Sequence, residues 1–211
     1  EAAKLGFETP LTPQALAGLT FDALFSTVVR PALTIAGRVS VPAEPDDEHL
    51  PNVRSAAATL AAVRARFPQE SVLWFAEVVC RRRLGDAAAT LAVAREGAQR
   101  FPGDWGVRTA HLNALRDAGR PDEALGEARQ ALTIQPDDCS PLHDAAWAFA
   151  DQQRFQEASQ LFAELGSRDA DYPGGRAAYH YTRWKAFQQP DDRAALVHLR
   201  ERDPDAARFA D

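Results

Sequence analysis

Three prolines recur at one interval and constrain the fold more than any other feature of the sequence. Pro68, Pro102 and Pro136 are each 34 residues apart, and the first two end the similar strings RARFP and AQRFP. A small residue lies twelve positions before each of these prolines: Ala56, Thr90 and Ala124. A period in this range indicates stacked repeats, because one short unit cannot bury both of its apolar faces alone.

The stretch 104–138 shows what one repeat contains. Its apolar residues follow the spacing of an amphipathic helix on either side of a central turn. Gly119 predicts the end of the first helix, because glycine readily adopts the left-handed conformation that closes a helix. Pro121 predicts the start of the second helix, where its missing N–H needs no partner, and Pro136 predicts its end. The small side chain of Ala124 indicates close packing against a neighbouring helix.

These features resemble the tetratricopeptide repeat (TPR) family of 34-residue helix-turn-helix units. The resemblance rests on the string GRPDEA at 119–124, the pair Ala158 and Phe162, and the closing prolines. It covers about residues 52–204 and is best over 104–172.

The first helix of the repeat departs from the family pattern. Arg108, His111 and Leu112 stand where the TPR motif prefers Trp, Leu and Gly, so the chain resembles a divergent group. The resemblance implies an all-α, right-handed superhelical solenoid of helix-turn-helix repeats with an N-terminal helical cap.

The pattern also predicts the division of the chain. Residues 1–51 are expected to form the cap and an acidic, proline-rich linker, and residues 52–211 the repeat array. Within the array we expect a second helix at 52–68 and four repeats, at 71–102, 104–136, 139–172 and 174–204.

The N-terminal region is expected to be helical on both sides of a break. Thr12 and Pro13 predict a short helix start, and the apolar segment 20–39 predicts two short helices or one helix kinked at Pro31. We interpret 20–39 as a cap on the first repeat, with a docking element for another subunit as the alternative. The string VPAEPDDEHLP at 41–51 predicts an extended linker.

Composition argues against several classes of function. A net charge of −6 and a pI of about 5.4 disfavour nucleic-acid binding. No run approaches the roughly 20 apolar residues of a membrane span, so no membrane insertion is expected. The five histidines and two cysteines lack metal-site spacing, and no nucleophile–base motif or phosphate loop is present. We therefore expect no enzyme, no metal and no cofactor.

The first helices line the concave surface in the TPR family, and the resemblance therefore selects candidate ligand residues. They combine aromatic anchors with polar and cationic groups, which suits a peptide with apolar and acidic features. Trp147 and Trp184 could instead fill the core between repeats. Thr109 and Asp144 replace the Lys and Asn of the chaperone-binding clamp, which disfavours that ligand class. The candidates are Arg82, Asn113, Arg116, His143, Trp147, Tyr181, Trp184 and Lys185.

The predicted fold and ligand residues indicate two alternative functions. The first is a non-catalytic interaction module or scaffold that binds a peptide or protein partner. The second is an accessory repeat region of a larger enzyme, or of a secretion or envelope assembly. We expect a cytoplasmic protein, with a periplasmic or secreted one as the alternative because the sequence does not begin with Met. The sequence does not predict the oligomeric state.

Overall fold

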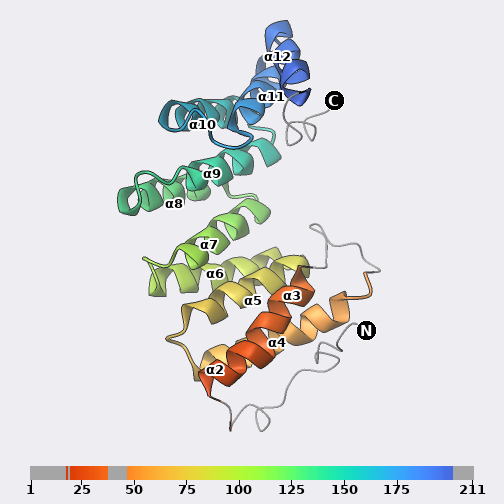
Figure 1. Ribbon diagram of the computed structural model, residues 1–211, viewed down its shortest axis with the longest axis vertical. Helices are drawn as coiled ribbons and strands as arrows, with labels where there is room; N and C mark the ends of the chain where they lie inside the picture. Colours follow the sequence, from red (N-terminus) through yellow and green to blue (C-terminus); the bar gives the residue numbers. More distant parts are fainter. Residues whose placement is uncertain (1–17, 19, 38–46, 202–211) are drawn as a thin grey trace. The chain divides into compact units, whose positions relative to one another are not determined.

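The computed structural model describes Gly18, residues 20–37 and residues 47–201. Every regular element in these residues is a helix, which confirms the all-α prediction (Figure 1). The contacts divide the chain into two compact units, 1–114 and 115–211. The helix start predicted at Thr12 and most of the 41–51 linker lie outside the described residues.

The first unit begins with a helical segment that contains a π-helical turn. It consists of α2 (Phe21–Leu24), η1 (Phe25–Val29) and α3 (Arg30–Ala36). Thr20 caps the segment, since its hydroxyl oxygen accepts a hydrogen bond from the Ala23 N–H at 3.3 Å. The Arg30 N–H donates to the Phe25 carbonyl, five residues back, immediately before Pro31. The predicted break at Pro31 is therefore a π turn inside a continuous helical segment.

Three longer helices follow in the first unit: α4 (Leu50–Arg66), α5 (Ser71–Arg83) and α6 (Ala87–Arg100). Helix α4 begins two residues before the predicted start at Asn52. The N-terminal helical segment packs on α4 and α5 (Figure 1). Their apolar side chains share one buried core, whose largest members are Leu24, Ile35, Leu60 and Leu73.

The carboxylate of Glu77 is buried within this unit. The Glu77 side chain on α5 is fully inaccessible and receives a hydrogen bond on each oxygen. The Arg64 Nε–H of α4 donates to Oε2 and the Arg81 Nε–H of α5 donates to Oε1, both at 2.7 Å. The Arg64 guanidinium also lies 4.1 Å from the ring centroid of buried Trp74. Arg81 is the first of three consecutive arginines, 81–83, and its side chain thus pairs with a buried acid.

Helix α7 (Trp105–Asp117) contains the boundary between the units. The second unit then contains α8 (Pro121–Ile134), α9 (Ser140–Asp151), α10 (Phe155–Arg168), α11 (Gly175–Phe187) and α12 (Pro190–Arg200). From α8 onward, each helix packs on the next along the chain. Gly119 has φ +66° and Pro121 lies in the first turn of α8, as their positions in the sequence predicted.

Ion pairs in the second unit join residues about one repeat apart. Arg116 pairs with Asp151 and Arg129 pairs with Glu164, each across 35 positions. The second pair places α8 beside α10, which are the second helices of successive predicted repeats. Each pair contributes little stability by itself, about 0 to 1 kcal/mol, because its side chains are partly exposed. The pairs nevertheless fix which residues of neighbouring helices lie together.

The start of α9 is fixed by the residues just before it, with Cys139 at the N-cap position. Ser140 is the first residue of the helix, and the Asp138 Oδ1 atom accepts hydrogen bonds from the Ser140 N–H at 2.9 Å and its hydroxyl at 2.7 Å. The Asp138 side chain therefore holds the turn that leads into α9.

Replacing Ala124 with leucine should lower the free energy of unfolding by about 1 to 3 kcal/mol, because Ala124 is 1% exposed and the added atoms would overpack the core. Thermal unfolding followed by circular dichroism measures the effect. Gln130→Leu adds a similar side chain at an exposed site on α8 and should change stability by no more than about 0.5 kcal/mol. Equal melting temperatures for the two variants would show that the space around Ala124 is not tightly packed.

Candidate functional site

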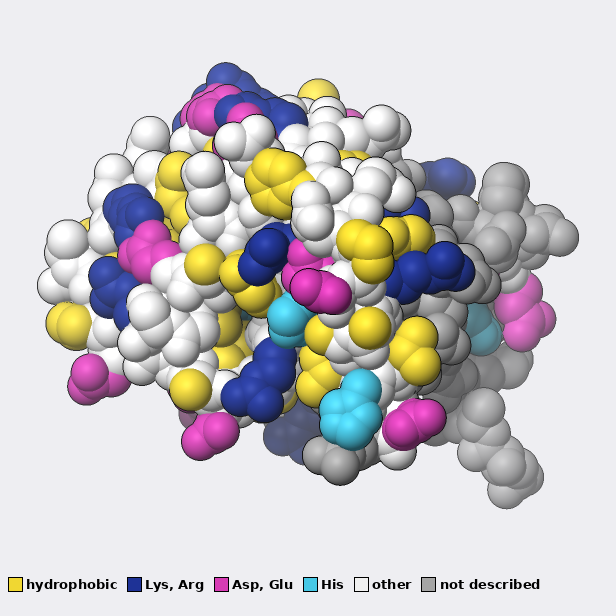
Figure 2. All heavy atoms as spheres, turned by 90° about the horizontal axis from the view of Figure 1, so that it is seen from above, with side chains coloured by type: hydrophobic (Ala, Val, Ile, Leu, Met, Phe, Trp, Pro, Cys, Tyr) yellow, Lys and Arg dark blue, Asp and Glu magenta, His cyan; other side chains and the backbone are white. Residues whose placement is uncertain are grey.

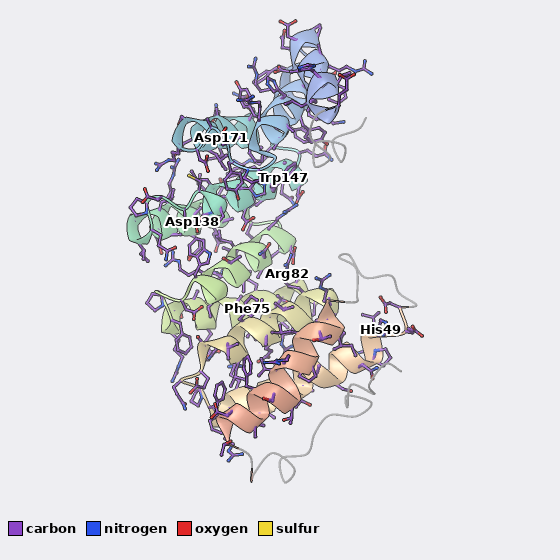
Figure 3. The ribbon with its side chains drawn as sticks, viewed as in Figure 1. His49, Phe75, Arg82, Asp138, Trp147 and Asp171 are labelled. Atoms are coloured by element: carbon purple, nitrogen blue, oxygen red, sulfur yellow. The ribbon has the colours of Figure 1, made fainter. Side chains whose placement is uncertain are left out.

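The second unit brings most of the predicted ligand residues into one connected group. Residue 116 lies at the end of α7, residues 143 and 147 on α9, and residues 181, 184 and 185 on α11. We call this group the aromatic–cationic surface; its members are Arg116, His143, Trp147, Tyr181, Trp184 and Lys185. The other two candidates, Arg82 on α5 and Asn113 on α7, belong to the first unit. Figure 3 labels Arg82 and, in the second unit, Trp147.

Rings and cations follow one another along the surface. The Arg116 guanidinium carbon lies 5.9 Å from the Trp147 ring centroid, and the Trp147 and Tyr181 centroids are 6.4 Å apart. The Lys185 ammonium lies 5.5 Å from the Tyr181 centroid and 4.7 Å from the Trp184 centroid. These distances are within the range of cation–π attraction and aromatic pairing.

Trp147 belongs both to this surface and to the interior beneath it. Its ring is partly exposed and lies 5.3 Å, edge to face, from the ring of buried Phe162. Its indole N–H donates to His143 Nε2 at 3.0 Å, which places the proton of a neutral His143 on Nδ1, 3.5 Å from the Asp144 carboxylate. Trp147 therefore packs on the interior while part of its ring stays exposed.

Two side chains that the sequence assigned to ligand binding are already engaged. The Arg116 guanidinium holds Asp151 at two points, with Nε at 2.5 Å from Oδ2 and Nη2 at 3.3 Å from Oδ1. The Asn113 amide donates to the Thr109 carbonyl of its own helix at 3.0 Å. Each of these groups therefore already has a partner within the chain. Among described carboxylates, none lies within ion-pair distance of Lys185, so Lys185 is the better candidate for an acidic ligand.

The structure adds two residues that the sequence analysis missed. Arg193 on α12 lies with its guanidinium carbon 5.8 Å from the Trp184 centroid. Phe155, the first residue of α10, meets the Tyr181 ring at 6.4 Å and an interplanar angle of 89°. Both come from helices other than those expected to line the groove, and no residue spacing along the chain indicated their contacts.

The described residues show no arrangement for metal or thiol chemistry. No cluster of three or more His, Cys, Asp or Glu side chains among them could hold a metal ion. Burial, and next the charge of Glu77, raise the pKa of the Cys80 thiol to about 12, and burial also raises the pKa of Cys139. Neither thiol therefore ionises readily near neutral pH, as a nucleophile would.

Charges of both signs lie on the face of the molecule that is seen from above (Figure 2). On the face seen in Figure 2, basic and acidic side chains are interspersed with apolar ones instead of forming one large basic field. In the part of the chain that the structure describes, no helix is both long enough and apolar enough to span a bilayer.

No family model matches this sequence. Two curated proteins are similar to part of it, and each is described as a poly-beta-1,6-N-acetyl-D-glucosamine export protein, one from Escherichia coli strain K12 and one from Escherichia coli O157:H7. Each is 31% identical over 81 residues, which make up 38% of this chain and 10% of the relative. The similarity is thus to a short segment of a much longer protein.

Proposed function

We propose that this chain is a TPR-like interaction module, with its helix pairs stacked as a right-handed solenoid, and that it binds a segment of a partner protein. The observation that carries the proposal is the connected aromatic–cationic surface of the second unit. Large rings with adjacent cations are the side chains that most often dominate protein interfaces. The pairing of corresponding helices through Arg129 and Glu164 supports the stacked arrangement.

The surface fits a segment that combines apolar and acidic side chains. Trp147, Tyr181 and Trp184 offer partly exposed aromatic area. Lys185 and Arg193 add positive charge beside Trp184, and no described carboxylate pairs with Lys185. A ligand carboxylate would gain a charge-assisted hydrogen bond there, while its neighbouring apolar side chain covers the rings.

A second candidate function is an accessory region of an export or envelope assembly. The partial similarity to the poly-beta-1,6-N-acetyl-D-glucosamine export proteins favours it. The bound segment would then belong to another protein of that assembly, or the ligand would be the polymer itself. The cations beside Tyr181 and Trp184 favour an acidic protein segment over a neutral sugar, which would stack on open ring faces.

Trp184→Ala is expected to weaken partner binding by about 2 kcal/mol or more, because an aromatic anchor at the centre of a contact contributes most of its energy. Lys185→Gln should weaken it by about 1 to 3 kcal/mol through loss of a charged hydrogen bond. The chain and its variants would be immobilised to capture partners for quantitative mass spectrometry, and the dissociation constants would then be measured.

Arg129→Gln is the matched control, because it removes a cation of the same unit that pairs with Glu164. The proposal is supported if a partner protein is captured by wild type and by this control but not by either surface variant. The circular dichroism spectra of all the variants should then match that of wild type. If Trp184→Ala and Lys185→Gln both capture this partner protein as well as wild type does, the proposed surface is refuted. Saturable quenching of Trp fluorescence by an N-acetylglucosamine oligomer, abolished in Trp184→Ala, would favour the polymer as the ligand instead.

A further inference from the structure

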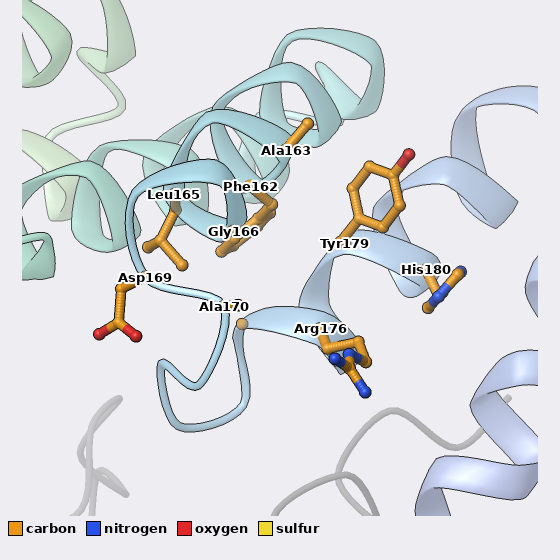
Figure 4. Close-up of a pocket in the computed structure, with 10 residues that line it drawn as sticks. Phe162, Ala163, Leu165, Gly166, Asp169, Ala170, Arg176, Tyr179 and His180 are labelled. Atoms are coloured by element: carbon orange, nitrogen blue, oxygen red, sulfur yellow. The ribbon is translucent and has the colours of Figure 1, made fainter.

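A pocket of about 320 Å³ lies between α10 and α11, at a different place on the second unit (Figure 4). Phe162 and Leu165 of α10 and Tyr179 of α11 supply its apolar wall. On α11 the pocket uses positions 176, 179 and 180, whereas the aromatic–cationic surface uses 181, 184 and 185. At helical spacing these two sets lie on different sides of α11, so the pocket is separate from that surface.

The two rims of the pocket carry opposite charges. Arg176, in the first turn of α11, is exposed and forms no ion pair with any described residue. Asp169, immediately after α10, is exposed on the other rim, where its Oδ1 accepts a hydrogen bond from the Asp171 N–H at 3.1 Å. The helix ends add to this difference, because the start of α11 is electropositive and the end of α10 is electronegative.

The wall formed by α11 is held in position from behind. The Tyr179 hydroxyl accepts a hydrogen bond from Arg183 at 2.9 Å. His180 Nδ1 lies 2.9 Å from the Asp192 carboxylate, which is buried on α12 and whose second oxygen is 3.4 Å from Arg183. A wall fixed before binding reduces the entropy that a ligand must overcome.

An open position on α10 keeps the pocket accessible. A Cβ atom built on Gly166 meets no atom within 4 Å, and Gly166 lines the pocket. Neither a left-handed backbone nor a close neighbour requires glycine there. A larger side chain at 166 would therefore enter the pocket without straining the helix, which makes the site simple to block.

We propose that this pocket binds a linear segment of a partner protein through one large apolar side chain. The side chain enters between α10 and α11, an acidic residue on one side of it meets Arg176, and a basic residue on the other side meets Asp169. The volume is at the lower end of the range for ligand pockets, about 300 to 1,000 Å³, and suits one side chain such as Phe. The opposed charges of the rims select this partner over a uniformly acidic one.

The test uses the acetylated and amidated peptide Ala-Glu-Phe-Lys-Ala, with 4-fluorophenylalanine at its centre, titrated with the full 211-residue chain and followed by fluorine NMR. We expect a saturable shift in the millimolar range with wild type. Gly166→Leu should remove it, and Gly126→Leu, at an exposed helical glycine on α8 that also has open space, should leave it unchanged. Arg176→Gln should weaken binding by about tenfold, the equivalent of one charged hydrogen bond.

Two further arms separate the possible outcomes. Ala163→Phe blocks the pocket from an exposed position one turn earlier on α10, so the prediction stays testable if Gly166→Leu fails to fold. Trp184→Ala should bind the peptide as wild type does, because the pocket does not depend on the aromatic–cationic surface. Absence of a saturable shift with wild type, or unchanged binding in folded Gly166→Leu or Ala163→Phe, would overturn the proposal.

Discussion

Replacing Glu77 with alanine is expected to lower the free energy of unfolding by about 3 to 5 kcal/mol, as removal of one partner from a buried ion pair does. The Glu77 carboxylate has no solvent access and accepts hydrogen bonds from Arg64 and Arg81 at 2.7 Å. Alanine would leave two guanidinium groups with 19% and 26% side-chain exposure facing each other without their shared acid. Urea unfolding monitored by circular dichroism measures the loss.

Glu96 provides the matched control on α6. Its carboxylate is 63% exposed and lies 3.9 Å from the same Arg64, so Glu96→Ala should cost no more than about 1 kcal/mol. Glu77→Gln keeps the shape of the side chain but removes its charge, and we expect a loss between those of the other two variants. If Glu77→Ala and Glu96→Ala unfold at the same urea concentration, the buried carboxylate does not stabilise the first unit.

In the second unit, Phe162→Ala is expected to lower the free energy of unfolding by about 3 to 5 kcal/mol, because it leaves a cavity where a large side chain was. This loss is as large as the one expected for Glu77→Ala. Phe162 is 1% exposed and supports the rings of His143 and Trp147 at centroid distances of 5.9 and 5.3 Å. The variant should also change the intrinsic fluorescence of Trp147, which loses the ring against which it packs. Thermal unfolding followed by both circular dichroism and fluorescence tests the two effects.

Phe187→Ala is the control for that measurement. Phe187 lies in the same unit but is 45% exposed, so its removal should change stability by about 0.5 kcal/mol or less. The stability of Phe162→Leu should lie between those of Phe162→Ala and Phe187→Ala, since leucine retains most of the buried volume. Stability in Phe162→Ala equal to that of the Phe187→Ala control would mean that Phe162 is not part of a tightly packed interior.

Local chemistry allowed the helices of the repeats to be predicted from the sequence. Gly119 and Pro121 mark a turn by backbone conformations that depend on each residue alone, and the structure has α7 ending before the first and α8 starting at the second. The apolar period likewise gives the buried face of each helix without knowledge of its partner. These features act over a few residues, and a linear sequence displays them directly.

Pairings between distant residues could not be found in the same way. Arg116 forms an ion pair with Asp151, which is 35 positions away in the sequence. Nothing in the sequence near Arg116 indicates that pairing. Glu77 stands in the apolar string WFAEVVC, where its burial depends on Arg64 of another helix. The pocket beside Gly166 likewise exists only once α10 and α11 are packed together.

The ion pairs between neighbouring helices limit how the length of this chain can change during evolution. An insertion of one residue within α10 ahead of Glu164 would turn that side chain by about 100° around the helix axis and move it away from Arg129. An insertion in a turn would instead leave the spacing inside each helix unchanged. Single-residue insertions inside these helices are therefore expected to break the ion pairs, whereas the turns are the places where a change of length is compatible with them.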